Sequence, residues 1–508
     1  MSSPATGQSY GRILKSSALL GGSSLVNVLL GMLRVKVLAV QLGPALFGVM
    51  SLYTSLTGMI CSVVSLGIGQ SAVREIAAAA GSGDEQRVAR TVAILRRVVW
   101  LTGGLGLLVT IAVALPASWW TFGDHIHAWA IALLAVTVLF TQLQAGQGAL
   151  LLGLRKVREV AMINLLGGVW STLLAIPILL IFREQGIVPF LIAVAAGQLA
   201  SSWWYARRVP LAAVRVSWSE TLHGSREMLH LGLTLVVSGV AVTASGYLIR
   251  LILQHQIGEA AVGLYQSAFT ISGLYVGFIL EAMGGDYYPR LAAVGEDRLQ
   301  RNQLVNEQAE MAILLAVPGL VAALVVSEVL IRLLYSDRFA GASDILRWQM
   351  LGLLGRIITW PLGYILLARA DKRAFLFTEL AAVGVHILLV WLAVQAFGAV
   401  GAGIAFAGQY LFYLFLITAV IRMRHGFSWH AQGRRLVAYG ALLVMVAFVS
   451  TYIGSTIWRY LAGGLLMLIT LAWSLQGFIQ RLGRERLLAA LRGLAQRVGW
   501  VRAEVTHE

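Results

Sequence analysis

The chain alternates between long apolar runs and short polar segments. Each apolar run has about 18 to 26 residues bounded by charged or turn residues, which is the length that a helix needs to cross a bilayer. We therefore predict fourteen transmembrane helices. They are expected near residues 17–41, 46–68, 95–116, 127–152, 160–182, 187–205, 230–255, 261–284, 310–334, 345–368, 374–396, 400–421, 436–453 and 456–478.

Composition narrows the range of functions. Of 508 residues, 58% are apolar and 12% are charged, which leaves no stretch for a large soluble catalytic domain and excludes most enzymes. The net charge of +16 could indicate nucleic-acid binding, but the chain has no basic domain and no nucleic-acid motif. The sequence also lacks a Walker motif, zinc-ligand spacing and a nucleophile elbow, so no catalytic residue and no metal site are predicted.

The basic residues instead indicate membrane topology. Most of the 39 lysines and arginines fall on the side of the membrane that holds the N-terminus, and only Arg183, Arg332, Arg338 and Arg459 fall on the other. Because positive charge is retained in the cytoplasm, both termini are predicted to be cytoplasmic. The tail, residues 479–508, alternates basic and apolar residues at helical spacing, so it either lies on the anionic inner leaflet or only aids solubility.

An internal repeat determines the expected architecture. The segment Gln41–Gly48 is similar to Gln256–Gly263, 215 residues later, and the same offset aligns Gly148–Leu152 with Gly363–Leu367. Each copy has an even number of spans, so both copies start on the same side and form parallel repeats. We therefore predict an all-α integral membrane protein with two pseudo-symmetric six-helix lobes around a central cavity and two extra C-terminal helices.

The predicted domain boundaries follow the spans. In order they are a cytoplasmic N-terminus (1–16), an N-lobe of spans 1 to 6 (17–206), a cytoplasmic linker (207–229), a C-lobe of spans 7 to 12 (230–424), the extra spans 13 and 14 (425–478) and a cytoplasmic, amphipathic and basic tail (479–508).

Several stretches of the chain are similar to one family. Leu42–Val49, Leu66–Gly69, Tyr288–Leu291, Tyr335–Phe339 and Trp348–Gly352 resemble the O-antigen translocase family of polysaccharide flippases, in the MATE-like superfamily of multidrug, oligosaccharidyl-lipid and polysaccharide exporters. The resemblance covers residues 10–424. It implies two lobes that carry an undecaprenyl-diphosphate-linked oligosaccharide to the periplasmic leaflet of the bacterial inner membrane by alternating access. Many members stop after span 12, so the extra pair is a departure.

The resemblance also implies partners and an energy source. The substrate would be an O-antigen or related surface polysaccharide unit, and the protein partners would be a glycan polymerase and a chain-length regulator. No cofactor is expected. Coupling to H⁺ or Na⁺ is left open.

Cations inside the predicted spans are candidates to bind the diphosphate, because a charged side chain there costs about 2.5 to 3.5 kcal/mol on insertion scales. Arg356 lies near the middle of its span, where the alternative is a structural ion pair. Arg34 and Arg250 lie at similar depth in the two repeats, as do cavity-lining arginines of the similar lipid II flippases. The alternative to a diphosphate-binding role for Arg34 and Arg250 is that their side chains snorkel to the membrane interface. Lys36 and Arg347 are further candidates.

Other polar residues in spans could contact the sugar or move protons. Glu379 and His386 lie on one helical face and could relay protons, or each could bond to a nearby arginine or carbonyl group. Glu328 is expected to pair with Arg332 at i+4. The candidates for glycan contacts are Asn27, Gln142, Gln144 and Gln147, for which hydrogen bonding between helices is the alternative.

Two rival functions remain at this stage. A multidrug exporter of the same superfamily would favour aromatic and acidic cavity residues over arginines. A polyprenyl-linked glycan polymerase or ligase would need a large periplasmic loop with catalytic residues, whereas the outward loops predicted here have about ten residues or fewer.

Overall fold

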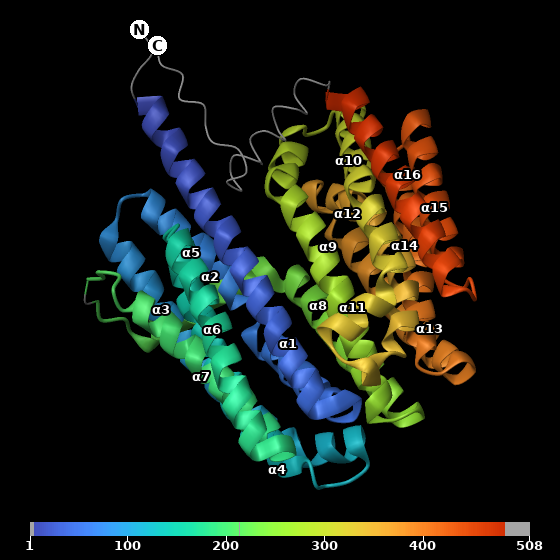
Figure 1. Cartoon of the computed structure of the whole chain (residues 1–508). Coiled ribbons are helices and arrows are strands. Elements are labelled where there is room, and N and C mark those ends of the chain that lie inside the picture. The colour runs from blue at the N-terminus through green and yellow to red at the C-terminus, as the bar shows by residue number, and fades with distance from the viewer. Residues whose placement is uncertain (1–4, 213, 483–508) are drawn as a thin grey trace, which may run out of the picture. The chain divides into compact units, whose positions relative to one another are not determined.

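In the computed structural model of the chain, every regular element of the part that it describes is a helix (Figure 1). It describes the backbone of residues 5–212 and 214–482, and side chains from Val28 onward except at 175, 213, 223, 225–235, 281–282, 285–286 and beyond 481. Most of the predicted C-terminal tail and the first four residues therefore lie outside the described residues.

The helices are, in chain order, α1 (Ala5–Ser65), α2 (Ile68–Gly81), α3 (Glu85–Phe122), α4 (Ala128–Leu133), α5 (Ala135–Gly153), α6 (Val157–Phe182), η1 (Arg183–Gly186), α7 (Ile187–Ala206), α8 (Trp218–Gln256), α9 (Glu259–Ala293), α10 (Arg298–Val325), α11 (Ser327–Leu334), η2 (Asp337–Phe339), α12 (Ala342–Ala368), α13 (Lys372–Phe397), α14 (Val400–His425), α15 (Ala431–Ser450) and α16 (Thr456–Leu482).

Twelve segments of the described chain are long and apolar enough to cross a membrane, by length and composition. The fourteen predicted spans fall on these twelve segments because two segments hold two spans each. The first, Val28–Ser65, is broken at Gly43, where φ is 67° and ψ is 179°. The other, Val157–Ala206, contains α6 and α7 with the short η1 between them. The all-α membrane fold is confirmed.

Large apolar side chains cover the outer surface of many of these helices. Leu108, Trp129 and Leu468 are exposed by 64%, 73% and 67%. A soluble protein would not leave so many such side chains in water, whereas lipid tails cover them without cost. The chain is a multi-pass membrane protein.

The described chain forms two compact units. The first runs to Gln266 and includes Arg332–Phe339; there α5 packs between α3 and α7, and α1 packs against α6 and α8. The second comprises Ser267–Ile331 and the chain from Ala340 onward, and there α14 packs against α12 and α13. The extra helices α15 and α16 lie side by side against α10 (Figure 1). The predicted domain boundaries stay a prediction.

Aspartate and serine residues in the loops begin several of the helices. Asp84, Asp297 and Asp371 accept backbone N–H groups at the starts of α3, α10 and α13. Ser217 and Glu220 form a reciprocal capping box at the start of α8. Each cap contributes about 1 kcal/mol to helix stability, and together they fix where the chain leaves the loops and enters the spans.

Equivalent residues of the repeat meet inside the first unit. Gly43 and Gly258 both have positive φ, 67° and 114°. A Cβ added at Gly48 would overlap the carbonyl oxygen of Glu259, and one added at Gly263 would overlap that of Pro44. Each pair, Gly48 with Gly263 and Pro44 with Glu259, is separated by the repeat offset. We call this close contact of α1 and α9 the repeat crossing.

Candidate functional site

Arg356 of α12 lies in the second unit and faces α14. Its side chain is half-buried, and its guanidinium carbon is 6.0 Å from the centre of the Tyr410 ring. The guanidinium forms no hydrogen bond and no salt bridge with any side chain that the structure describes, although such groups normally have both when they are removed from water. An arginine placed in this way is available to an anion.

Glu379 of α13 provides negative charge near this arginine. Its Oε1 accepts a hydrogen bond from the Tyr413 hydroxyl at 2.8 Å. Glu379 also interacts electrostatically with Arg356. Tyr410 and Tyr413 were not predicted as site residues. The signal for them was available, because both tyrosines follow Ala407–Gln409 within an apolar span, and the other repeat has the same three residues at Ala196–Gln198.

His386 lies two turns beyond Glu379 on the same helix and is 7% exposed. Its Nε2 atom has no hydrogen-bond partner among the described residues. The ring contacts Phe406 at 6.0 Å between centroids, and Phe406 in turn contacts Tyr410 at 5.0 Å. Both His386 and Glu379 therefore face α14, but no described side chain joins them by hydrogen bonds, and the proton relay stays a prediction.

Arg250 of α8 lies in the first unit and is 7% exposed. Its Nε donates to Ser51 Oγ at 2.8 Å and to Gln266 Oε1 at 3.1 Å, and its Nη1 donates to the Gly246 carbonyl at 2.5 Å. Ser51 also donates to Gln266 at 2.8 Å, and these two residues are separated by the repeat offset of 215. Arg250 thus joins α1, α8 and α9 beside the repeat crossing.

Arg34 and Lys36 of α1 point to different neighbours. Arg34 is half-buried and donates to Ser171 Oγ of α6, while Lys36 Nζ donates to the Arg332 carbonyl at 2.9 Å. This agrees with helical geometry, since residues two positions apart lie about 200° apart around a helix. Arg34 donates to Ser171, whereas Arg250 donates to Ser51 and Gln266.

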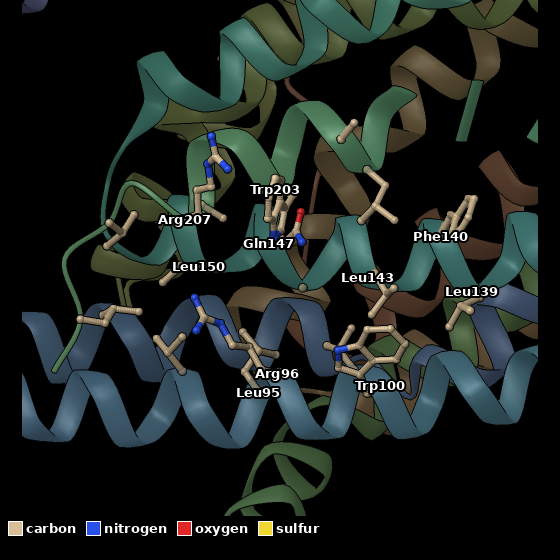
Figure 2. Close-up of a pocket in the computed structure, with 18 of the residues that line it drawn as sticks. Leu95, Arg96, Trp100, Leu139, Phe140, Leu143, Gln147, Leu150, Trp203 and Arg207 are labelled. Atoms are coloured by element: carbon tan, nitrogen blue, oxygen red, sulfur yellow. The ribbon is translucent and has the colours of Figure 1, made fainter. Parts of the chain in front are cut away.

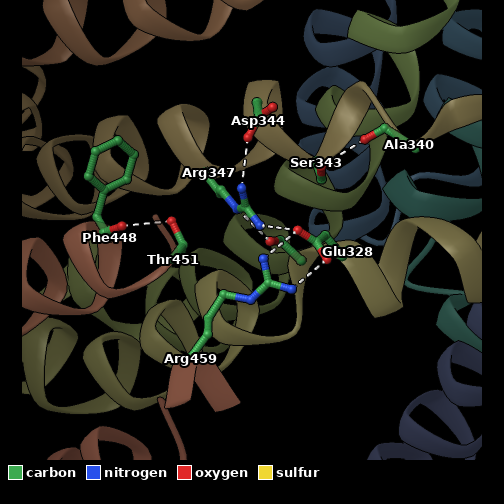
Figure 3. Close-up of polar contacts among 9 residues, drawn as sticks. Glu328, Ala340, Ser343, Asp344, Arg347, Phe448, Thr451 and Arg459 are labelled. Carbon is green, nitrogen blue, oxygen red and sulfur yellow. Dashed lines mark hydrogen bonds and ion pairs between the residues drawn. The ribbon is translucent and has the colours of Figure 1, made fainter. Parts of the chain in front are cut away.

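Arg347 belongs to an ion network in the second unit (Figure 3). It pairs with Glu328 at 2.8 Å and with Asp344 at 2.7 Å, and its Nε donates to Ser327. Arg459 of α16 also pairs with Glu328, at 2.9 Å. With its donors engaged by two carboxylates, Arg347 links α12 to α11 and has little left to offer a substrate.

The expected pairing of Glu328 with Arg332 is wrong. Arg332 instead lies 3.5 Å from Asp337, while Glu328 is taken by the two arginines of the network. The short helix α11 directs Glu328 toward α12 and α16, and those longer-range partners form closer contacts than an i+4 neighbour on a solvated helix face would.

Two cavities in the first unit are each lined by one of the four predicted glycan contacts. The smaller, of about 280 Å³, is lined by polar residues including Gln70, Thr102 and Gln142. Gln142 also donates to the Cys61 carbonyl at 2.9 Å. Gln147 lines a larger cavity of about 870 Å³ and accepts a hydrogen bond from Ser202 (Figure 2).

The structure does not place the other two predicted glycan contacts in either cavity. Gln144 lines neither of these cavities and is half-buried. The side chain of Asn27 lies outside the described residues. Among the described residues, no three His, Cys, Asp or Glu side chains lie together in a way that could hold a metal ion.

Comparison with known proteins shows what the chain is similar to. Residues 13–294 match the family model described as polysaccharide biosynthesis protein. The lipid III flippase of Escherichia coli (strain K12) is 24% identical over 422 residues, which cover 80% of this chain and 98% of the relative. These relationships confirm the family resemblance seen in the sequence.

Solved structures show the same fold. The lipid II flippase MurJ in an inward closed conformation has a TM-score of 0.72 at 13% identity and covers 92% of this chain and 100% of its own. An inward-facing multidrug resistance MATE family transporter of the MOP superfamily has a TM-score of 0.66 at 13% identity, covering 80% and 98%. The relatives are flippases and transporters, which confirms that this chain is not an enzyme. The chain belongs to the polysaccharide biosynthesis protein family and has a MATE-like fold.

Proposed function

We propose that this protein moves a polyprenyl-diphosphate-linked oligosaccharide, an O-antigen or related surface polysaccharide unit, across the bacterial inner membrane. Translocation is by alternating access, from the cytoplasmic to the periplasmic leaflet, with both termini in the cytoplasm. The family match and the similarity to a lipid III flippase support a lipid-linked substrate. The arrangement of basic residues along the chain supports the orientation.

Arg356 carries the proposal. A cation placed in a membrane-spanning helix without a described hydrogen bond is costly, and such residues mark substrate pathways. Its guanidinium can donate two parallel hydrogen bonds to a diphosphate. The face of the Tyr410 ring, over which it lies, cannot accept such a pair. Binding of the anion would therefore satisfy donors that the resting protein leaves open.

Arg34 and Arg250 are the proposed ligands in the first unit. Both already donate to side chains, Arg34 to Ser171 and Arg250 to Ser51 and Gln266. Binding substrate would exchange these neutral acceptors for phosphate oxygens, which form stronger, charge-assisted hydrogen bonds. Such an exchange gives the ligand different affinities for two conformations, as alternating access requires.

Glu379 is the proposed proton acceptor of the cycle. It lies near Arg356 and is bonded to Tyr413, so a diphosphate bound to Arg356 would bring negative charge close to this carboxylate. Like charges in one site favour protonation of the weaker acid. Uptake of a proton by Glu379 would then accompany substrate binding.

The test is Arg356→Ala in cells that lack the native gene, with surface glycan and membrane protein level measured together. We expect normal protein level and loss of surface glycan, because removing a mid-span cation eases insertion but removes the anion ligand. Arg373→Ala, an exposed arginine at the start of α13, is the matched control and should complement. Full complementation by Arg356→Ala would contradict the proposal, and a change confined to drug susceptibility would favour a multidrug exporter.

A further inference from the structure

A large groove lies on the first unit, separate from the proposed diphosphate ligands. It is the 870 Å³ cavity formed by α3, α5 and α7 (Figure 2). Most of its lining is apolar, including Leu95, Leu143 and Leu150. Arg34, Arg250 and Arg356 do not line it. We call it the α3–α5–α7 groove.

Two arginines lie at one end of this groove. Figure 2 shows Arg96 and Arg207 near Leu150, whereas Leu139 and Phe140 lie toward the opposite end. Both arginines are exposed, and neither pairs with a carboxylate that the structure describes. The Arg207 guanidinium lies 4.5 Å from the Trp203 ring and 4.4 Å from the Trp204 ring, which fixes it at the rim.

Exposed tryptophans mark the same groove as membrane-facing. Trp100 and Trp203, both in its lining, are exposed by 60% and 52%. Tryptophan is enriched at membrane interfaces, and Arg207 lies at the C-terminal end of α7, where a span leaves the membrane. The groove therefore runs from an interfacial, cationic end into an apolar region of the spans.

We infer that the α3–α5–α7 groove binds an anionic phospholipid, with the phosphate held between Arg96 and Arg207 and an acyl chain along the leucine-lined trough. Basic pockets between transmembrane helices recognise anionic head groups in this way. An apolar partner helix would leave two arginines beside it without an acceptor, at a cost that a phosphate avoids. A zwitterionic lipid would fill the trough but bring its own positive charge to the arginines.

The bound lipid would connect α3 and α7, which both pack against α5. Arg96 belongs to α3 and Arg207 follows α7, while α5 packs between these two helices. A phosphate that binds both arginines would hold α3 and α7 at a fixed separation. The inference rests on the membrane location of the chain and does not require the proposed function.

The experiment measures lipid retention by the full-length protein with native mass spectrometry. The protein is reconstituted in two kinds of nanodisc and then released for measurement. One kind contains phosphatidylethanolamine alone, and the other contains equal amounts of phosphatidylethanolamine and phosphatidylglycerol. We expect selective retention of phosphatidylglycerol by the unmodified protein. The double variant Arg96→Gln/Arg207→Gln should lose about 30-fold in apparent affinity, which corresponds to two interfacial cations.

The matched control is Arg87→Gln/Arg208→Gln. Arg87 is an exposed residue of α3 outside the groove, and Arg208 is next to Arg207 and lies 4.5 Å from the same Trp204 ring. The control removes the same charge from the same helix ends and should retain phosphatidylglycerol. If both double variants lose the lipid equally, the effect is a general surface charge and the inference is wrong.

A second variant tests the trough without altering charge. Ala200 lines the groove and is exposed, so Ala200→Phe should fill the trough and reduce phosphatidylglycerol retention while leaving the fold intact. Unchanged retention in Ala200→Phe would overturn the inference, as would equal retention of both lipids. Displacement of phosphatidylglycerol by an added polyprenyl diphosphate would assign the groove to that lipid instead.

Discussion

Arg250 and Arg356 are arginines in spans of the two units, and the sequence favours both as diphosphate ligands, yet their surroundings differ. Arg250 is buried and donates to a hydroxyl, an amide and a carbonyl oxygen from three helices. Arg356 is half-buried against the Tyr410 ring and donates to no described side chain. A cation whose donors hold helices together also stabilises the fold and can bind a ligand only by exchanging those partners, whereas one with open donors can bind a ligand directly.

The largest expected effect is the loss of stability in Arg250→Ala. Removing the guanidinium leaves the buried Ser51 and the half-buried Gln266 with fewer partners, and hydrogen bonds to charged groups contribute about 1.5–3 kcal/mol each. Thermal unfolding of the purified protein should show a much lower midpoint, with Arg208→Ala unchanged as the control. An unchanged midpoint would show that these hydrogen bonds contribute little to stability and would leave Arg250 only its proposed role as a ligand.

The repeat crossing should be the next most sensitive position. In Gly263→Ala the new methyl group overlaps the Pro44 carbonyl, and overpacking of this kind costs about 1–3 kcal/mol. Gly273→Ala lies on the same helix with open space around it and should be neutral or slightly stabilising. Equal midpoints for the two variants would show that α1 and α9 are not in close contact and that Arg250 does not secure them.

Arg356→Lys tests whether Arg356 needs its two parallel donors or only its charge. Lysine keeps the charge but cannot form two parallel hydrogen bonds to a diphosphate, so we expect transport to fall about tenfold, the equivalent of one lost contact. Flipping of a labelled lipid-linked oligosaccharide in proteoliposomes measures the effect. Full activity would mean that Arg356 acts only through its charge.

The smallest effect should come from charges outside the spans. A hydrogen bond from Arg369 lowers the pKa of Glu296 below its ordinary value. Because the pKa is lower in the folded state, the contribution to stability is present above the unfolded pKa and disappears as the pH falls through the folded pKa. Glu296→Gln should remove the small fall of the thermal midpoint at acidic pH and leave the midpoint at neutral pH nearly unchanged. A large change at neutral pH would contradict the surface role.

The sequence predicted those features that depend on local composition or on the repeat. The apolar runs located the spans, and the repeat aligned Gly43 with Gly258, which the structure shows with positive φ at both positions. The same pattern could not locate α2 or α11, because a short helix at the ends of longer ones carries no separate hydropathy signal. Arg356 was identified from its depth in the span alone.

Partners far apart in the sequence could not be predicted. Glu328 was assigned to its i+4 neighbour, but it pairs with Arg347 and with Arg459, 131 residues away. Likewise nothing in the sequence indicates that Gln142 donates to the Cys61 carbonyl. Such contacts depend on which helices become neighbours, and periodicity describes only which face of one helix is apolar.

The hydrogen bond between Ser51 and Gln266 joins residues that occupy the same position in the two copies of the repeat. Contact between equivalent residues is the mark of an isologous two-fold interface. The repeat crossing therefore preserves the geometry of a homodimer of half-length chains, each presenting its glycine to the backbone of the other. Because both copies lie in one chain, the two halves need not be identical. The position equivalent to Arg250 is Val35, so a single guanidinium lies beside an otherwise symmetric contact, an asymmetry that no homodimer of identical subunits could encode.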